Sequence, residues 1–488
     1  MEKLSNYING EWVAPANEAY LTQINPATRE PLYQVPLSTV ADVDQAVEAA
    51  EAAYPAWRAL TSQQRAHYLY AMAEQLQQQI TPFAQWESMD NGKPLSQTES
   101  IDIPRSIHNL RFFAEAINQW SSESHQGQGS LNYTTRQPRG VAACISPWNL
   151  PLYLLTWKIA PALVTGNTVV AKPSEITPYT AYQFSTVAHQ VGLPPGVLNI
   201  IHGTGQSCGE SLVTHPKVSS VTFTGGTATG QRIATQIAPQ FKKYSLELGG
   251  KNPQLVFADC NITETVTETI RAAFTNQGQI CLCSSRILVE ASIYEAFKSE
   301  LVTRTAQLVV GDPLLEETQQ GAVVSEAHYH KILAAIEHAQ QEGGNILTGG
   351  HSLHPKGRCQ HGFFIAPTII EGVAPDSDTC QQEIFGPVIT LTPFSSTEEA
   401  VTLANQTAYG LSASIWTNHL QRAHAVADAL DAGIVWINSW LLRDLRTPFG
   451  GMKQSGMGRE GGHEALRFFT EPKNICMPMP NLMDSRSG

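Results

Sequence analysis

Hydrophobic positions near the start of the chain recur at helical spacing. In the first such segment the apolar residues stand at i, i+3, i+4 and i+7, which here are Val43, Ala46, Val47 and Ala50. Thr39 is placed to cap this helix. The same spacing predicts a second helix over residues 63–89, broken near Pro82, and a third that begins at Pro104, since proline suits a first helical turn.

From about residue 139 the pattern changes to short apolar runs that alternate with helical segments. The first set comprises GVAACI (140–145), TVVAK (168–172), VLNII (197–201), VSSVTF (218–223) and QLVF (254–257). The second set comprises SRILVE (285–290), GFFIAPTII (362–370), PVITLTPF (387–394), SASIWT (412–417) and GIVWIN (433–438). Such alternation is typical of parallel sheets covered by helices, so we predict two α/β domains that meet near residue 250.

Two further segments have the alternation of exposed strands. They are LNYTTRQ (131–137), ahead of the first set, and FFTEPKNICM (468–477), near the end of the chain. Strands that lie outside both cores are available for pairing, so we predict that they form an oligomerisation ribbon. The tail MDSRSG (483–488) is expected to lack fixed structure.

Composition and charge narrow the class of protein. A chain of 488 residues is too long for one core, and 42% hydrophobic with 15% charged residues is typical of a soluble globular protein. The net charge of −12 and the lack of a basic run argue against nucleic-acid binding. No stretch approaches the roughly 20 apolar residues of a membrane span. Because MEKLSNYINGEW lacks an apolar signal core, we expect a cytoplasmic protein, in which disulfides are rare.

The eight cysteines are scattered, and no CxxC pair occurs, which argues against a structural zinc site. Two of them, Cys281 and Cys283, lie close together in the polar, glycine-containing segment FTNQGQICLCSSR (274–286). A free cysteine in such a loop is a candidate nucleophile. The spacing alone does not choose between the two, and a metal site or a strained disulfide remains an alternative.

A glycine-rich turn follows one predicted strand. The segment VSSVTFTGGTATG (218–230) leads from the strand into Gly225 and Gly226, and a helix is expected to begin at Gly230. Backbone N–H groups at such a turn can bind a pyrophosphate. The spacing is G-x-T-x-x-G and not the usual G-x-G-x-x-G, so an ordinary strand–helix turn is an equal alternative.

The segment KPSE places Lys172 and Glu175 at the carboxyl end of another predicted strand, where ligands bind such sheets. Both side chains could hydrogen-bond the ribose hydroxyls of an adenosine. Glu175 would repel a 2′-phosphate, which favours NAD over NADP. A surface ion pair between the two residues is the alternative.

Two more residues are candidates for chemistry. Glu247 lies between two leucines in YSLELGGKNP (244–253), and partial burial should raise its pKa toward the range of a general base. A structural ion pair with Lys251 is the competing interpretation. Asn149, within ISPWNLPLYLLTWK (145–158), could stabilise a developing oxyanion, although an asparagine more often binds its own loop.

Six motifs together resemble the aldehyde dehydrogenase superfamily: PWN (147–149), FTGGTATG (223–230), LELGGK (246–251), FTNQGQIC (274–281), EIFGPV (383–388) and PFGG (448–451). They span most of the chain, and their joint pattern is highly specific. The resemblance implies an α/β fold with a Rossmann-like NAD-binding domain (1–118 and 139–249) and an α/β catalytic domain (250–454). It also implies a small β ribbon (119–138 and 468–482) that joins subunits into homodimers or homotetramers.

The resemblance also implies roles for individual residues. Cys281, and not Cys283, takes the position of the nucleophile that attacks the aldehyde carbon. Asn149 would hold the oxyanion, hydride would pass to NAD⁺, and Glu247 would activate the water that hydrolyses the thioester. Lys158 matches a family lysine near the active site. The implied NAD contacts are Ser146, Trp148, Lys172, Ser174, Glu175, Gly205, Gly225, Gly226, Gly230, Glu383 and Phe385, and no metal is implied.

Two arginines indicate the substrate. Arg105 and Arg443 stand where many members of the family place apolar residues of the substrate tunnel, together with Trp157, Leu150 and Phe449. Two guanidinium groups would bind a carboxylate and repel a cationic aldehyde. Local sequences such as RDLRTPFGGMKQSG resemble the muconic semialdehyde dehydrogenases, so we expect 2-aminomuconic or 2-hydroxymuconic 6-semialdehyde as substrate.

Other outcomes stay open for these arginines and for the substrate. Arg443 could pair with Asp444 at the surface, and Arg105 could lie on a solvated helix face. The enzyme would then be a broad aldehyde dehydrogenase for aliphatic, retinal or betaine aldehydes.

Overall fold

The predicted first helices are present, with shifted boundaries. The computed structural model describes residues 1–479, and α1 (Val40–Ala59) begins where the Asp42 carboxylate accepts the backbone N–H of Thr39 at 2.8 Å. The predicted second helix is two helices, α2 (Ser62–Gln77) and α3 (Ile80–Asn91). The break falls before Pro82, which lies in the first turn of α3, where its missing N–H needs no partner.

Pro104 lies at the start of α5 (Ile103–Ala116), as predicted. A π-helical turn, η1 (Thr98–Asp102), directly precedes α5 and was not predicted.

An eight-stranded sheet organises the first half of the chain, in the order β24-β12-β11-β8-β9-β10-β2-β3. Its five central strands are parallel: β8 (Val141–Ile145), β9 (Thr168–Lys172), β10 (Leu198–Ile200), β11 (Val218–Thr224) and β12 (Lys243–Glu247). The outer strands are β2 (Asn6–Ile8), β3 (Glu11–Val13) and β24 (Gly456–Met457), of which β3 and β24 form the edges, and all three pair antiparallel. The last of these returns from far along the chain to pair with β12.

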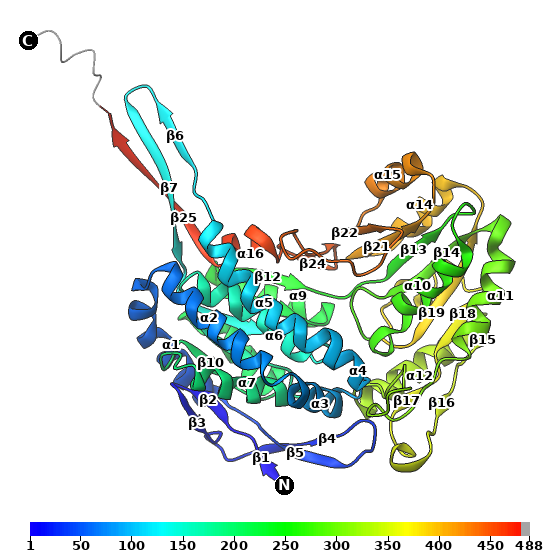
Figure 1. Cartoon of the computed structure of the whole chain (residues 1–488), viewed down its shortest axis with the longest axis horizontal. Helices are drawn as coiled ribbons and strands as arrows, with labels where there is room; N and C mark the ends of the chain where they lie inside the picture. Colours follow the sequence, from blue (N-terminus) through cyan, green and yellow to red (C-terminus); the bar gives the residue numbers. More distant parts are fainter. Residues whose placement is uncertain (480–488) are drawn as a thin grey trace, which may run out of the picture.

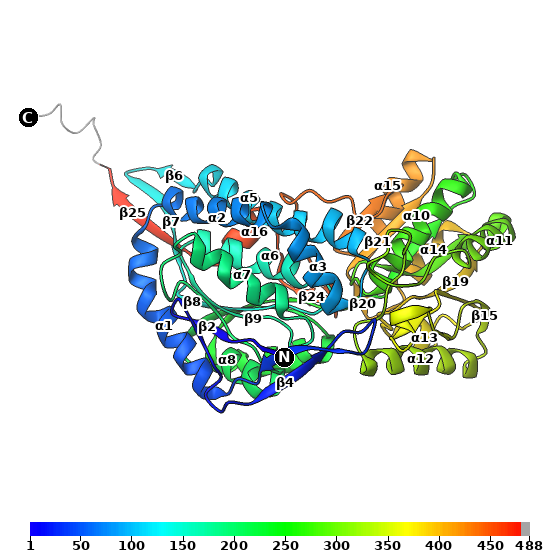
Figure 2. The same ribbon diagram turned by 60° about the horizontal axis from the view of Figure 1, so that its bottom comes forward.

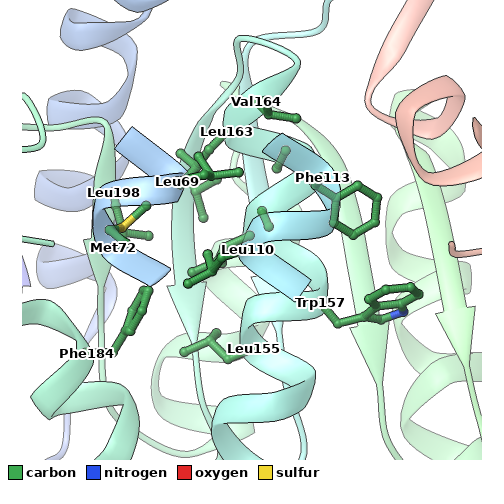
Figure 3. Packing of buried hydrophobic residues seen from close by; sticks show 14 of the residues in the cluster. Leu69, Met72, Leu110, Phe113, Leu155, Trp157, Leu163, Val164, Phe184 and Leu198 are labelled. Carbon is green, nitrogen blue, oxygen red and sulfur yellow. The ribbon is translucent and has the colours of Figure 1, made fainter. Parts of the chain in front are cut away.

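Helices cover both faces of this sheet (Figure 2). Helices α2, α5, α6 (Pro151–Val164) and α7 (Tyr179–Gln190) bury one apolar cluster, in which Leu69, Leu110, Leu155 and Phe184 meet (Figure 3). Helices α1, α8 (Glu210–Thr214) and α9 (Thr227–Ile237) bury a second cluster on the other face. Burial on both faces explains why the strands are continuous apolar runs instead of alternating ones.

A seven-stranded sheet forms the second unit, in the order β15-β18-β19-β14-β13-β21-β22 (Figure 1, right). Its strands are β13 (Asn252–Val256), β14 (Ser284–Glu290), β15 (Asn345–Thr348), β18 (Thr368–Glu371), β19 (Val388–Phe394), β21 (Ser412–Trp416) and β22 (Ile434–Ile437). The run QLVF, assigned above to the first set, belongs here, because its strand β13 pairs with β14 and β21. The segment 362–370 divides into β17 (Phe364–Ile365) and β18.

A three-stranded antiparallel ribbon projects from the body (Figure 1, upper left). It consists of β6 (Ser124–Gly127), β7 (Ser130–Pro138) and β25 (Thr470–Pro478). The predicted exposed strands are thus confirmed as a pair, β7 with β25. Phe468 instead ends α16 (Gly462–Phe468). Residues 480–482 of the predicted ribbon and the tail 483–488 lie outside the described residues. No helix within residues 1–479 combines the length and apolarity needed to cross a bilayer.

Candidate active site

The loop that carries Cys281 lies between α10 (Ile262–Phe274) and β14 and is shaped by a chain reversal. Asn276 has a φ of 54° and the following residue a φ of 55°, a conformation that costs roughly 1–3 kcal/mol in non-glycine residues. The reversal brings Gln279 next to Asn149, whose Nδ2 donates to the Gln279 carbonyl at 2.8 Å. Asn252 Nδ2 donates to the Cys281 carbonyl at 2.7 Å. The nucleophile candidate is therefore held on a fixed backbone, and Asn149 binds this loop and not its own.

Only one of the two neighbouring cysteines is open to a reactant in the central cleft. Cys281 lines a cleft of about 230 Å³ together with Asn149 and Glu383. Cys283 does not line it, and its Sγ faces the Thr275 carbonyl at 3.8 Å. All eight cysteines are free thiols. The one group of three metal-binding side chains found within residues 1–479, His338, Glu342 and Asp378, includes neither cysteine.

The Cys281 thiol is protonated at rest. Burial raises its pKa, the charges of Glu383 and Glu247 raise it further, and Arg443 opposes them. A base must therefore accept the thiol proton before Cys281 can attack.

Glu247 ends β12 and is buried, with 4% of its surface exposed. Neither carboxylate oxygen has a hydrogen-bond partner within the described chain. Burial raises its pKa well above the ordinary value, and the Glu460 charge adds to this, while Lys158, Arg459 and Arg443 oppose it. No ion pair forms with Lys251, so the structural-pair alternative is wrong. A desolvated carboxylate without partners is suited to accept a proton.

Lys158 is buried on α6 and belongs to a polar cluster beside Glu247. Its Nζ donates to Glu460 Oε1 at 2.6 Å and to Thr222 Oγ1 at 2.9 Å. Thr222 in turn donates to Glu460 at 3.0 Å. Sequence reasoning missed Glu460, because no motif marks it and it lies 302 positions from Lys158.

A larger cleft of about 540 Å³ opens at the carboxyl ends of β8, β9 and β11 and shares residues with the cleft at Cys281. The predicted cofactor residues that line one or both clefts are Ser146, Trp148, Lys172, Ser174, Glu175, Gly205, Gly225, Gly226, Glu383 and Phe385. Lys172 and Glu175 pair at 3.5 Å within the cleft. The hydroxyls of Ser146 and Thr224 lack partners in the described chain. Joined clefts with unpaired hydroxyls fit an elongated polar ligand such as a dinucleotide.

Gly230 is the exception among the predicted cofactor residues. Helix α9 begins at Thr227, with Gly226 as its cap, so Gly230 lies inside the helix and is buried. A Cβ added there would stand 2.5 Å from a Leu248 methyl carbon. The third glycine therefore serves close packing of α9 against Leu248 and does not line the cleft.

His328 was not predicted and lines the cleft beside Phe385, another residue of unusual backbone with a φ of 62°. Its Nε2 lies 2.7 Å from the Phe385 carbonyl, and its ring meets Trp148 edge to face. Glu383 is held by the Gly250 N–H at 2.9 Å.

Arg443 points into the protein. Its Nη1 donates to the Tyr153 hydroxyl at 2.8 Å, and its guanidinium lies 4.2 Å from the ring centre of Phe449 and 5.2 Å from that of Trp157. Asp444 binds Arg446 instead, at 2.5 Å, so the surface pair expected as an alternative for Arg443 is wrong.

Arg105, half-buried on α5, also lies near Tyr153. Its guanidinium lies 5.9 Å from the ring centre of Tyr153. Leu150, Tyr153 and Phe449 belong to the apolar cluster that packs against Cys281, whereas Trp157 is buried and contacts Arg443. Tyr153 was not predicted, and the sequence gives no sign that it joins the two arginines.

Comparison with known proteins agrees with this geometry. The model of the aldehyde dehydrogenase family matches residues 12–475. The chain belongs to the aldehyde dehydrogenase family. It is 46% identical to the 2-aminomuconic semialdehyde dehydrogenase of Bos taurus over 97% of this chain and 98% of that one. It is 42% identical to the 2-hydroxymuconic semialdehyde dehydrogenase of Pseudomonas sp. strain CF600, over 98% and 100% of the two chains.

Solved structures are also similar to this chain. An NAD⁺ complex of an aldehyde dehydrogenase from Bacillus cereus is 36% identical, with a TM-score of 0.95 over 98% of this chain and 97% of that one. The fold expected above, the aldehyde dehydrogenase fold, is confirmed. In this aldehyde dehydrogenase Cys281 and Asn149 line one cleft, and the charge of the buried Glu247 acts on the Cys281 thiol.

Proposed function

We propose that this aldehyde dehydrogenase oxidises an anionic semialdehyde, 2-aminomuconic or 2-hydroxymuconic 6-semialdehyde, to the dicarboxylic acid. The observation that carries the proposal is that Arg443 and Arg105 both lie at Tyr153, one at its hydroxyl and the other near its ring. Neither guanidinium has a carboxylate partner within residues 1–479. The names of the relatives, which are muconic semialdehyde dehydrogenases, support the same substrate class.

Charge explains why such a substrate is preferred. A carboxylate can accept two parallel hydrogen bonds from a guanidinium, and each hydrogen bond to a charged group contributes about 1.5–3 kcal/mol. The charge of Arg443 acts on both Cys281 and Glu247, so Arg443 lies near the thiol. A short molecule can therefore place its carboxylate at Arg443 and its aldehyde at Cys281. A neutral aldehyde leaves the arginines without a carboxylate partner, and a cationic one is repelled.

We infer that the cofactor is NAD⁺. The joined clefts fit a dinucleotide, and the Glu175 carboxylate beside Lys172 disfavours a 2′-phosphate. An NAD⁺ complex of a relative with the same fold supports this assignment. When bound, the nicotinamide accepts the hydride that converts the tetrahedral adduct into a thioester.

The residues of the chain supply the rest of the mechanism. Glu247 accepts the Cys281 proton, since both its oxygens are free whereas Glu383 is engaged by Gly250. The Cys281 sulfur then bonds to the aldehyde carbon, and the carbonyl oxygen becomes an oxyanion. One N–H of the Asn149 amide is held by Gln279, which leaves the second free for that oxyanion. The Cys281 proton then passes from Glu247 to solvent. In the final step Glu247 takes a proton from the water that attacks the thioester carbon, the bond to the Cys281 sulfur breaks, and the acid is released.

The domain assignment is part of the same proposal. Residues 1–118 and 139–249 would bind the cofactor, and residues 250–454 would supply the nucleophile. The ribbon of β6, β7 and β25 would join subunits into dimers or tetramers, since its outer strands have unpaired edges.

The test compares substrates on the wild type and two arginine variants. NADH formation is measured with 2-hydroxymuconic semialdehyde, 2-aminomuconic semialdehyde, hexanal and betaine aldehyde. Arg443→Met should lose at least about 10-fold in kcat/KM for the anionic aldehydes, which is about 1.4 kcal/mol, and little for hexanal. Arg446→Met is the matched control, because that side chain is 81% exposed and pairs only with Asp444. Equal turnover of hexanal by the wild type, with no effect of Arg443→Met, would show a broad aldehyde dehydrogenase instead.

A further inference from the structure

A buried lysine lies behind the proposed oxyanion donor. Lys93, in the turn between α3 and α4 (Leu95–Gln97), has no exposed surface. Its Nζ donates to the backbone carbonyl of Asn149 at 2.8 Å and to Asp102 Oδ2 at 2.7 Å, with Glu87 Oε1 at 3.6 Å. A buried ammonium loses its hydration and is retained only where it is well paired. Its one uncharged partner is the backbone of Asn149, the residue whose side chain is the proposed oxyanion donor.

The backbone that carries Asn149 depends on these contacts. The loop between β8 and α6 ends at Leu150, which caps α6 without any side-chain hydrogen bond. Three residues from α3 and the turn after it bind this segment, beside Asn276, whose Nδ2 also donates to the Asn149 carbonyl at 3.0 Å, and Thr177, which donates to the Trp148 carbonyl at 3.1 Å. Lys93 binds the Asn149 carbonyl, Asn91 Nδ2 donates to the Trp148 carbonyl at 2.9 Å, and Glu87 Oε2 accepts the Leu152 N–H at 3.3 Å.

Lys93 also ties this loop to the helix of Arg105. Asp102 is the last residue of the π-helical turn η1, and Arg105 follows three positions later on α5. Asp102 is the closer ion-pair partner of Lys93, at 2.7 Å against 3.6 Å for Glu87. One ammonium thus bridges the oxyanion donor and the start of the helix that carries a proposed substrate arginine.

We propose that Lys93 is a positioning residue for the oxidation, which fixes the Asn149 amide in the orientation that stabilises the oxyanion. The proposal rests on the role of Asn149 in the proposed function and not on the identity of the aldehyde. Loss of Lys93 should therefore slow the chemical step and leave cofactor binding unchanged.

The matched control is a second buried cation, Arg65 of α2, which contacts the other end of α6. Arg65 donates through Nε to the Val164 carbonyl at 2.9 Å, at the opposite end of α6 from Asn149. Like Lys93, it binds backbone carbonyls from within the core. Arg65→Met should lower the melting temperature and leave kcat within about 2-fold of wild type, since it does not touch the loop of Asn149.

The experiment is a double-mutant comparison on the full-length enzyme, with 2-hydroxymuconic semialdehyde and with hexanal. Lys93→Met should lower kcat about 10- to 100-fold with the NAD⁺ KM within about 2-fold, because a small misplacement of a catalytic donor costs that much. Lys93→Arg should recover part of the loss. Adding Lys93→Met to Asn149→Ala should cost little more than Asn149→Ala alone, since the lysine acts through the asparagine.

Two results would overturn the proposal. One is a Lys93→Met enzyme with wild-type kcat and only a lower melting temperature, and the other is a double variant whose loss is the product of the single losses. If Lys93→Met is insoluble, Asp102→Asn replaces it, and the same multiplicative loss with Asn149→Ala decides against the proposal. A lack of preference between the two aldehydes, by contrast, contradicts only the substrate assignment.

Discussion

Gly450 provides the space that the Glu247 carboxylate occupies. A Cβ added at Gly450 would stand 2.8 Å from Glu247 Oε1 and equally close to the Gly458 carbonyl, about 0.6 Å short of an ordinary contact at 3.4 Å. The carbonyl belongs to the backbone and cannot yield easily, so the carboxylate must move. We therefore expect Gly450→Ala to displace the base without removing it.

The size of the effect follows from this displacement. A general base contributes about 10²- to 10⁴-fold to a rate, and a misplacement of about 1 Å costs about 10²-fold. Gly450→Ala should thus lower kcat about 10- to 100-fold, or about 1.4–2.7 kcal/mol. The overpacking should also reduce the free energy of unfolding by roughly 1–3 kcal/mol.

Steady-state kinetics with saturating NAD⁺ and aldehyde measure this effect, together with melting temperatures and NAD⁺ binding. Gly311→Ala is the control, because a Cβ there meets only Thr318 Oγ1 at an ordinary 3.5 Å. If Glu247→Gln is inactive while Gly450→Ala keeps wild-type kcat, the positioning argument is wrong. If Glu247→Gln is itself active, the assignment of the base is wrong.

Three further predictions concern charge and space. Glu460→Gln should move the ascending limb of the pH–kcat profile to lower pH, because burial sets the raised pKa of Glu247 first and the Glu460 charge adds to it. Gly249→Ala would overlap the Glu383 carboxylate and should raise the KM for NAD⁺ more than it lowers kcat. His202→Leu should make melting less sensitive to acid. Burial holds the pKa of His202 at about 3 in the folded protein, against 6.5 in the unfolded chain. The free energy of unfolding of the wild type therefore falls by about 1.4 kcal/mol for each pH unit between 6.5 and about 3. An unchanged pH profile would contradict the prediction for Glu460→Gln, an unchanged KM for NAD⁺ that for Gly249→Ala, and an unchanged acid sensitivity that for His202→Leu.

The strand runs were readable from the sequence, because strands buried on both faces are continuously apolar. The sheet to which each strand belongs was not readable in the same way. QLVF was grouped with the first sheet, although β13 pairs with β14 and β21, and strand partners lie too far along the chain for periodicity to reveal them. The return of β24 to pair with β12 was missed for the same reason.

The residues of the candidate site were likewise predictable from the sequence only in part. Cys281, Glu247 and Asn149 lie in recognisable motifs, and the structure places Cys281 and Asn149 on one cleft, with Glu247 near enough for its charge to act on the thiol. Glu460 and Tyr153 carried none. Their importance comes from contacts with Lys158 and Arg443, 302 and 290 positions away.

The sequence by itself determined which chemical groups this enzyme has and on which kinds of element they lie, since residue type and local periodicity are properties of short segments. The tertiary structure decided which groups act on one another. Whether Arg443 bound Asp444 or Tyr153, and whether Glu247 bound Lys251 or stayed unpaired, depended on packing between distant segments. Ion pairs and pKa values depend on distance and burial, and only the folded chain fixes both.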